Sequence, residues 1–462
     1  MFVGRINELK EIGDAMNTDR FESVLIYGRR RVGKTELINE AIVKEINNYL
    51  IVSYECIKST ISENLTLFTK KLKTIFSDNY LYFNDFEELF TYIFEKSLNQ
   101  KIILFIDEFS FLLEENFSLE STLATIIDKF KTKTKMKLII SGSYVSLMEK
   151  MIEYGSHSYG RFTHIMLIRP FDYYDSSLFY NNYSNEDKIM LYSVFGGVPF
   201  FNSLIDTNKT AIENIMMLVI KKDSILEHEI NEMILSETGK IANMNFIISL
   251  ISRGVNKYKD ISDNLASVGI SKPDYLLNKL IEMDIIKKSF PINDENNKKK
   301  TFYTFKDNLL SFYYRYIFHT PYQEFRKNPN FFFENFIKED FYKEYIPKKF
   351  EMISMEYIIK ANINFLIKPI VLKVGTYSYN DAKNKINREF DVVTQDEKGF
   401  ISYECKYTNA LVDNSIIKEE EKQTKALDIN FYKLGFISKS GFSKEVDMKK
   451  YACISLNDFY KF

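Results

Sequence analysis

The sequence predicts an α/β protein that begins with a parallel β-sheet carrying a phosphate-binding loop, continues through a helical and winged-helix region, and ends in a second α/β domain. Short apolar strands alternate with amphipathic helices from residue 21 to 140, an order typical of βαβ units. A glycine-rich turn directly follows the first strand. Beyond residue 171 helical patterns dominate, and strand patterns return toward the C-terminus.

The composition limits the possible classes of protein. The chain has 462 residues, which predicts about three domains, and its net charge of -1 argues against a histone-like coat on nucleic acid. Three distant cysteines indicate neither a disulfide framework nor a zinc site. The N-terminus lacks a signal-peptide pattern, and no apolar run has the length of a membrane span. We therefore expect a soluble, cytoplasmic protein without membrane contact.

Four apolar segments predict the strands of the first sheet, at residues 23–27, 50–54, 102–106 and 137–141. The segment from Gly28 to Thr35 follows the first strand and fits the pattern G-x-x-x-x-G-K-[ST]. Gly28 and Gly33 let the backbone curl so that its N–H groups point at phosphate oxygens, and the helix that follows adds its positive N-terminal end. We expect Lys34 to reach the β- and γ-phosphates and Thr35 to coordinate Mg²⁺. The predicted nucleotide-binding residues here are Gly28, Arg29, Arg30, Arg31, Val32, Gly33, Lys34, Thr35 and Glu36.

Polar residues after the later strands complete this prediction. The strand at residues 102–106 delivers Asp107, which we expect to hold Mg²⁺, and Glu108, which we expect to orient or deprotonate the attacking water. Ser143 is either a sensor of the γ-phosphate or part of a simple turn. Arg161 is either a charge stabiliser, in cis or from a neighbouring subunit, or a surface residue. The three arginines of the loop are further candidates, unless they face a partner or DNA.

Several motifs resemble known ATPases. The opening Phe2-Val3-Gly4-Arg5, with Glu8-Leu9, resembles the start of AAA+-related ATPases of the STAND and MNS group, in which this segment packs near the adenine. The resemblance implies ATP as the nucleotide, with Gly4 and Arg5 beside it. The segments 141–143, 159–161 and 196–199 resemble the archaeal-type ATPase family. In STAND proteins a Gly-x-Pro element approaches the nucleotide, which implies that role for Pro199.

The resemblance extends to the C-terminus. The segment 303–318 is similar to the transition in archaeal ATPases that carry a DUF234 region, which is itself similar to PD-(D/E)XK nuclease folds, the restriction-endonuclease-like class. It implies an ATPase core at 1–180, a helical lid at 181–238, a winged helix at 239–320 and a nuclease-like domain at 330–462, with a linker at 321–329.

Carboxylates in this last domain form a candidate metal site. The segments 389–393 and 401–406 predict a hairpin that brings Asp391 toward Glu404 and Lys406, which share one strand face. Two carboxylates on a divalent ion beside a lysine can cleave phosphodiesters. The nuclease resemblance assigns these three residues and adds an upstream acid, for which we favour Glu351 over Glu356, with Gln423 bracketing the site. The alternative is a cross-strand salt bridge of little energetic weight. The run 418–422 is interpreted as a solvated helix face.

Helices expected at 241–253, 259–266 and 272–283, followed by a hairpin at 285–290 and 301–305, indicate the winged helix. It either contacts DNA or packs within the molecule, since acids interrupt its lysines, which are Lys272, Lys279, Lys287, Lys288 and Lys298–Lys300. The aromatic residues 331–333 and 336 are expected in a core or domain interface.

Two functions follow from these observations. The first is an ATP-hydrolysing enzyme that couples its nucleotide state to a nuclease-like domain acting on DNA or RNA. The second is an ATP-dependent switch whose C-terminal domain binds without cleaving, and in which self-association is possible. A motor function ranks last because no further helicase motif is visible.

Overall fold

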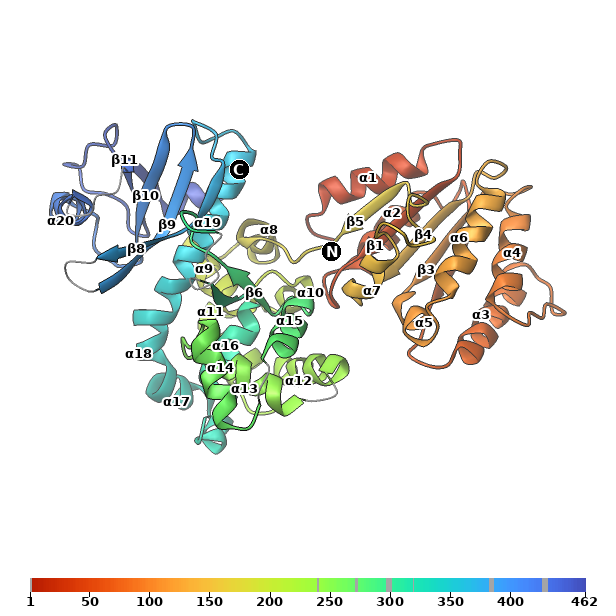
Figure 1. The fold of residues 1–462 in the computed structure, drawn as a ribbon, viewed down its shortest axis with the longest axis horizontal. Helices are drawn as coiled ribbons and strands as arrows, with labels where there is room; N and C mark the ends of the chain where they lie inside the picture. Colours follow the sequence, from red (N-terminus) through yellow and green to blue (C-terminus); the bar gives the residue numbers. More distant parts are fainter. Residues whose placement is uncertain are drawn as a thin grey trace. The chain divides into compact units, whose positions relative to one another are not determined.

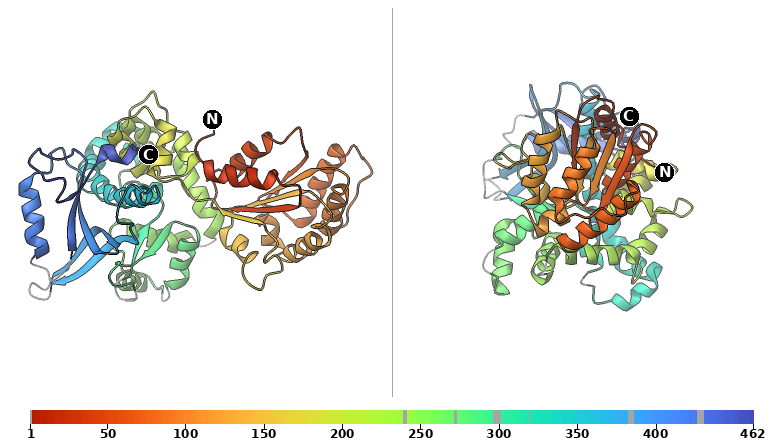
Figure 2. Two further views of the ribbon diagram at one scale, coloured as in Figure 1. Left: turned by 90° about the horizontal axis from the view of Figure 1, so that it is seen from above. Right: turned by 90° about the vertical axis from the view of Figure 1, so that its right-hand side faces the viewer.

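The computed structural model describes residues 2–238, 241–270, 273–295, 301–318, 320–381, 386–425 and 431–462. The chain forms two compact units, Met1–Pro170 and Phe171–Phe462 (Figures 1 and 2). Within the described ranges, no helix combines the length and the apolar character that a membrane crossing needs. The expected lysines at 272 and 298–300 lie outside these ranges.

The first unit is built on a fully parallel sheet with the order β2–β3–β4–β1–β5 (Figure 1). Its strands are β1 (Glu22–Tyr27), β2 (Leu50–Glu55), β3 (Ile102–Asp107), β4 (Lys137–Gly142) and β5 (His164–Leu167). β1, β3 and β4 are buried along their whole length, as central strands covered on both faces must be. The predicted parallel sheet is confirmed. β5 was not predicted, because it has only four residues, of which only Met166 is buried, and so gives a weak strand pattern.

Helices cover both faces of this sheet and form two separate cores. They are α1 (Ile6–Met16), α2 (Lys34–Val43), α3 (Ile61–Ile75), α4 (Phe86–Lys96), α5 (Ser110–Glu115), α6 (Leu119–Phe130) and α7 (Val145–Lys150). α1 and α2 pack on one face, where Ile12 and Leu37 meet strand residues such as Ile26. α3 to α7 pack on the other, where Phe68 and Leu123 are fully buried. The α/β layers therefore leave the strand ends free to carry polar groups.

The second unit begins with helices. They are α8 (Tyr173–Ser177), α9 (Asn185–Phe195), α10 (Pro199–Ser203), α11 (Ala211–Ile215), α12 (Ile225–Thr238), α13 (Ile241–Ser252), α14 (Tyr258–Ser267), α15 (Asp274–Glu282) and α16 (Asn308–Tyr316). An antiparallel pair, β6 (Ile286–Ser289) and β7 (Phe302–Phe305), follows α15. The expected order of three helices and two strands is therefore present. The expected linker at 321–329 instead contains a packed turn, because Arg326 is buried and its guanidinium binds the Glu227 carboxylate at 2.7 Å.

A mixed sheet with the order β12–β11–β10–β9–β8 forms the C-terminal part (Figure 1). Its elements are α17 (Pro329–Phe332), α18 (Lys338–Asp340), α19 (Ile346–Ile363), β8 (Lys373–Asp381), β9 (Ile386–Asp396), β10 (Gly399–Lys406), α20 (Asn414–Lys425), β11 (Phe431–Ser438) and β12 (Ala452–Ser455). β9 is antiparallel to both its neighbours, whereas β10, β11 and β12 run parallel. α19 packs against β8, β9 and β10.

The segment between β6 and β7 closes the edge of this sheet. The Ile292 N–H donates to the Thr376 carbonyl at 2.8 Å, and the Asn293 side chain bonds both the N–H and the carbonyl of Ser378, at 3.0 and 2.9 Å. Ile292 also fills the space beside Gly375, where a Cβ would lie 2.5 Å from its Cγ2. β8 is therefore paired on both sides.

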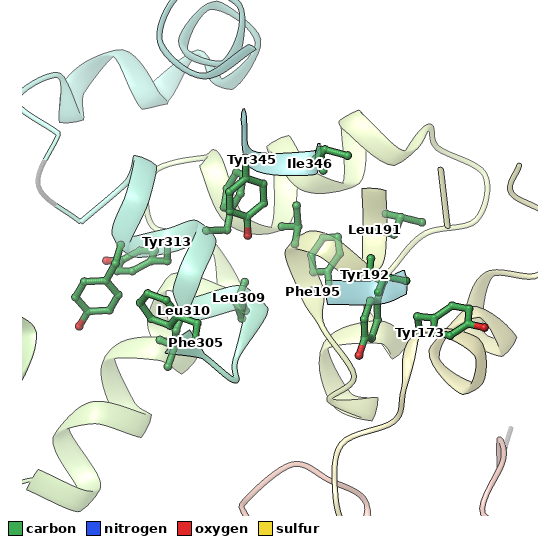
Figure 3. Close-up of a cluster of buried hydrophobic side chains, with 14 of the residues drawn as sticks. Tyr173, Leu191, Tyr192, Phe195, Phe305, Leu309, Leu310, Tyr313, Tyr345 and Ile346 are labelled. Carbon is green, nitrogen blue, oxygen red and sulfur yellow. The ribbon is translucent and has the colours of Figure 1, made fainter. Parts of the chain in front are cut away.

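An aromatic core joins the helices of the second unit (Figure 3). Phe195 of α9, Leu309 of α16 and Ile346 of α19 are all buried there. The Tyr345 hydroxyl reaches back to the Ser193 carbonyl at 2.9 Å. This packing fixes α19, which carries a candidate acid, against the helical region. The aromatic run expected in a core is divided: Phe332 and Phe333 are buried, whereas Phe331 and Phe336 are partly exposed.

Candidate functional site

The phosphate loop runs from the end of β1 to the start of α2 and is tightly constrained. A Cβ on Gly28 would lie 2.2 Å from the Ile168 carbonyl oxygen, so only glycine fits at that point. Arg31 and Gly33 have φ angles of 68° and 87°, which fold the backbone into a concave turn. Val32 is fully buried in the core beneath the loop. The loop therefore has the anchored, curled shape that the motif predicts for anion binding.

Lys34 lies across this loop. Its Nζ donates to the carbonyls of Gly28 and Arg29, at 3.0 and 3.3 Å, and lies 3.9 Å from Glu108 Oε1. Burial lowers the pKa of the Lys34 ammonium, although the nearby carboxylates act in the opposite direction. A desolvated cation of this kind is strongly attracted to an anion that enters the loop.

Thr35 and Asp107 meet at the mouth of the loop. The Thr35 hydroxyl donates to Asp107 Oδ2 at 2.6 Å, and the Ser141 hydroxyl donates to the other carboxylate oxygen. Asp107 is almost wholly buried at the carboxyl end of β3. These hydroxyl and carboxylate oxygens are the ligand types that Mg²⁺ prefers, so the residues present suit that ion.

Glu108 stands in a strained backbone conformation with a φ of 51°. Its Oε2 accepts hydrogen bonds from the Ser143 N–H and hydroxyl, at 3.1 and 2.6 Å, and from the Ser110 hydroxyl at 3.4 Å. Ser143, for which the sequence left open a sensor role or a simple turn, thus contacts the Glu108 carboxylate directly. Ser110 was not singled out from sequence, although its position two residues after Glu108 was a usable signal.

Arg5 does not project freely into the loop. It follows Gly4, and both residues have positive φ angles, of 66° for Gly4 and 58° for Arg5. The Arg5 guanidinium donates to the carbonyls of Val32 and Arg169 and to the Glu8 carboxylate. The N-terminal segment of the first unit is therefore hydrogen-bonded to the phosphate loop. The expected place of Gly4 and Arg5 beside adenine remains a prediction.

The remaining residues of the loop differ in their surroundings. Arg29 is buried and Glu36 is exposed in the first turn of α2. The Arg30 guanidinium lies over two rings, 5.5 Å from the centre of Phe111 and 5.9 Å from that of Tyr144. Because these rings follow Glu108 and Ser143 in the chain, Arg30 is held on the same side of the loop as the candidate catalytic carboxylate.

Arg161 is placed away from this loop. Its carbonyl accepts from the Ser23 hydroxyl at the start of β1, the strand whose other end carries the phosphate loop. Its guanidinium binds the Asp128 carboxylate at 2.6 Å. The expected role of Arg161 in cis is therefore wrong, because the length of β1 separates it from the loop. Pro199 lies in the second unit at the first turn of α10.

A second polar cluster lies on the C-terminal sheet. The pairing of β10 with β9 ends at Tyr403 and Val392, and Glu404 and Asp391 are the next residues of the two strands. Lys406 Nζ donates to Glu404 Oε1 at 2.6 Å. Burial lowers the pKa of Lys406, but this hydrogen bond to Glu404 outweighs burial and keeps the pKa raised. The hairpin that the sequence predicts therefore brings its three polar residues together.

α19 adds Glu351 to this cluster and also Lys348, which sequence reasoning missed. Lys348 Nζ bridges Glu351 Oε2 at 2.7 Å and Asp391 Oδ1 at 2.8 Å. Burial and the neighbouring Asp391 raise the pKa of Glu351 to about 7. Glu356, the second choice for the upstream acid, lies elsewhere, because its carboxylate bonds the Tyr192 hydroxyl at 2.9 Å inside the helical core.

α20 contributes Glu420. It lies in the run 418–422, whose interpretation as a wholly solvated face is wrong at this residue, because Glu420 is buried. Burial, with a further contribution from Glu404, raises its pKa to about 7. The side chain of Gln423 lies outside the described residues. Among the residues that are described, no three metal-binding side chains are spaced to hold an ion together.

The comparisons with known proteins cover both units. Residues 2–205 match a family described as an ATPase domain predominantly from Archaea, and residues 313–425 match DUF234, described as archaeal and bacterial proteins of unknown function. An uncharacterised protein of Methanocaldococcus jannaschii is 30% identical over 379 residues, which make up 82% of each chain.

Solved structures show weaker likeness. The Walker-type ATPase of Pyrococcus abyssi is 18% identical, with a TM-score of 0.48, over 68% of this chain and 96% of its own. The Aeropyrum pernix ORC2 protein, in its ADPNP–ADP complexes, is 11% identical, with a TM-score of 0.43, over 70% of this chain and 93% of its own.

Proposed function

The chain belongs to the archaeal-type ATPases with a C-terminal DUF234 region and is an ATP-hydrolysing enzyme, and we propose that its nucleotide state controls a metal-dependent, nuclease-like site in the second unit. The observation that supports this proposal is the pairing of β9 with β10, after which Asp391 and Glu404 are the next residues of the two strands, with Lys406 bound to Glu404. DNA or RNA is the substrate class that such a site would cleave.

In the first unit we assign each polar residue one task. The loop N–H groups and Lys34 bind the β- and γ-phosphates, and Gly4 lies close to the base. Thr35 and Asp107 hold Mg²⁺, which screens phosphate charge when bound. Glu108 accepts a proton from the attacking water, and Ser143 keeps its carboxylate aimed, since their contact is 2.6 Å.

Charge on the transferred phosphate needs a further cation. Arg30 is the candidate within the chain, because Phe111 and Tyr144 hold its guanidinium on the side of Glu108. If Arg161 acts on a phosphate, that phosphate belongs to a neighbouring copy, because Arg161 lies at the opposite end of β1. ATP hydrolysis per chain would then rise with protein concentration and fall in Arg161→Ala.

In the second unit we assign the carboxylates of Glu351, Asp391 and Glu404 to a divalent ion, whose binding would draw them closer together than they lie in this structure. Their oxygens suit a hard cation. The pKa of Glu351 is raised first by burial and then by the negative charge of Asp391, and a bound cation would relieve the second of these. Lys406 is assigned to the attacking water or the scissile phosphate. The mixed sheet, with only β9 reversed, supports the nuclease-like fold that the sequence resemblance implies.

We retain residues 239–320 as a winged helix and 181–238 as a helical lid, with Pro199 directed to the nucleotide. The order of α13, α14, α15, β6 and β7 supports the winged-helix assignment. Its contact with nucleic acid is best ascribed to Lys279 and Lys287, which lie in α15 and β6.

Cleavage assays on full-length protein test the proposal. Plasmid and single-stranded DNA are incubated with Mg²⁺ or Mn²⁺, with and without ATP, for the wild type, Lys406→Ala, Glu108→Gln and the control Lys398→Ala in the exposed β9–β10 turn. We expect cleavage that depends on ATP, is lost in Lys406→Ala and persists in Lys398→Ala. Equal cleavage with ATP, ADP and no nucleotide would contradict the coupling.

One observation favours the second candidate, a switch without cleavage. Lys348 bridges Glu351 and Asp391, and Lys406 neutralises Glu404, so two cations already compensate the acidic cluster. No cleavage by the wild type in any condition, together with ATP-dependent self-association or DNA binding, would favour this function.

A further inference from the structure

The guanidinium of Arg5 joins two backbone segments that are far apart in the sequence. A single nitrogen, Nη2, donates to the Val32 carbonyl at 3.2 Å and to the Arg169 carbonyl at 2.6 Å. The other terminal nitrogen binds Glu8 at 3.1 Å, which fixes the plane of the group. The Arg5 side chain is only 7% exposed, although its bond to the Arg169 carbonyl lies at the surface.

The Val32 carbonyl is coupled to a phosphate-binding N–H of the loop through a shared peptide group. It shares one planar peptide with the N–H of Gly33, the residue that caps α2 with a φ of 87°. This N–H is one of the loop donors that point at phosphate. A phosphate that orients the Gly33 N–H therefore also orients the Val32 carbonyl, and with it the hydrogen bond to Arg5.

The Arg169 carbonyl belongs to the connector, residues 168–171, which leads from the first unit into the second. At its start, the Ile168 N–H bonds the Tyr27 carbonyl at 2.7 Å, and its own carbonyl packs against Gly28. At its end, the Phe171 N–H bonds the Gly197 carbonyl at 2.8 Å. A Cβ on Gly197 would lie 1.8 Å from the Phe171 carbonyl oxygen, so the backbone is closely packed at this end of the connector as well.

We propose that Arg5 is a positioning residue that couples the phosphate loop to the connector, so that nucleotide binding changes the backbone that enters the second unit. The two carbonyls share one donor nitrogen, so a movement of either one alters the bond to the other. This coupling rests on nucleotide binding in the first unit and is independent of any cleavage by the second. Nucleotide binding to the loop would then have a second consequence besides hydrolysis, a change in the backbone of the connector.

Hydrogen–deuterium exchange on the full chain tests the coupling. Exchange is followed in peptides that span residues 166–175, without nucleotide and with saturating ATP and Mg²⁺. In the wild type we expect ATP to change exchange at the Ile168 and Phe171 amides by at least about fivefold, the lower end of typical coupling between sites. Arg5→Ala loses this change at an ATP concentration that saturates the variant, as measured by titration.

Two variants and one control sharpen the result. Arg5→Lys also loses most of the response, because a single ammonium does not reproduce the planar fork that holds both carbonyls. Glu8→Ala keeps Arg5 but removes the carboxylate that orients its guanidinium, so we expect a smaller response of the connector to ATP. This variant also keeps the test usable if Arg5→Ala does not fold. Arg20→Ala is the matched control, because Arg20 pairs with Glu22 at the start of β1 and should respond fully.

Three outcomes would overturn the proposal. One is a wild-type connector that does not respond to ATP. Another is a full response in Arg5→Ala or Glu8→Ala. The third is a folded Arg5→Ala protein that no longer binds ATP, which would make Arg5 a nucleotide contact. None of these outcomes depends on cleavage of nucleic acid, so failure here is distinguishable from failure of the nuclease assignment.

Discussion

The phosphate-loop site and the carboxylate cluster are organised in opposite ways. In the first, Glu108 is held by Ser143 and Asp107 by Thr35, and the loop itself is locked by contacts in which glycine alone fits. In the second, side chains from a helix and two strands meet, and lysines bridge the acids. The first site is preorganised by backbone, whereas the second is held by charges that compete with one another.

This difference teaches how each site should respond to change. A preorganised site loses rate when one group is removed, while its fold persists. A cluster of compensating charges responds instead through protonation, ion binding and stability. The four predictions below test that contrast, beginning with the largest expected effect.

Glu108→Gln should lower kcat for ATP hydrolysis by about 10²–10⁴-fold, because it removes the proton acceptor for water. ATP binding should remain, since the loop and Lys34 are unchanged. Steady-state hydrolysis and ATP titration measure the two quantities. A kcat within about twofold of the wild type would remove Glu108 from the mechanism.

Ser143→Ala should lower kcat by about tenfold or more, since a hydrogen bond to a charged group contributes about 1.5–3 kcal/mol. KM and unfolding temperature should change little. Ser121→Ala, at a half-buried position of α6, is the control. Unchanged kcat would show that Ser143 only closes a turn.

Glu420→Gln should stabilise the protein above pH 7 by on the order of 1–3 kcal/mol. The folded-state pKa of Glu420 is raised to about 7, so the folded chain binds more protons than the unfolded chain between the usual carboxyl range and pH 7. Its stability contribution is therefore complete at low pH and is lost as pH rises through about 7. Urea unfolding from pH 5 to 8 measures this slope, which should flatten in Glu420→Gln and persist in Glu419→Gln.

Lys348→Ala should tighten binding of Mn²⁺ by about fivefold, because a unit charge about 4 Å away contributes about 1 kcal/mol even in water. Removing the bridge between Glu351 and Asp391 leaves both carboxylates uncompensated. Calorimetric titration with Mn²⁺ measures the effect, with Lys398→Ala as control. Weaker binding in Lys348→Ala would show that the lysine supports the ion rather than competing with it.

The two sites also differ in how far the sequence predicted them. The phosphate loop is a local motif, so the residues from Gly28 to Thr35, and the two acids at the end of β3, could be identified from their spacing in the sequence. The partners of Arg5 did not, because Arg169 is 164 residues away and bonds through a backbone carbonyl that carries no sequence signal. A four-residue strand such as β5 is also too short to show periodicity.

In the second unit the sequence held signals that were not used. Lys348 and Glu351 are three residues apart on a helix, which is a pairing distance. Ile417, Glu420 and Thr424 are spaced by three and four residues, and all three are buried on one face of α20. The many charged residues in the run 418–422 made the whole helix look solvent-exposed, so its buried face was missed. The bridge from Lys348 to Asp391 required the tertiary structure, because β9 and α19 are distant in sequence.

The segment that closes the edge of β8 has a consequence for folding during synthesis of the chain. Ile292 and Asn293 are synthesised about 80 residues before the edge strand that they cover, and domains fold from the N-terminus as they emerge from the ribosome. An uncovered strand edge is a template for aggregation. In this chain the covering segment is already synthesised when β8 appears, so the order of translation favours early protection of this edge strand.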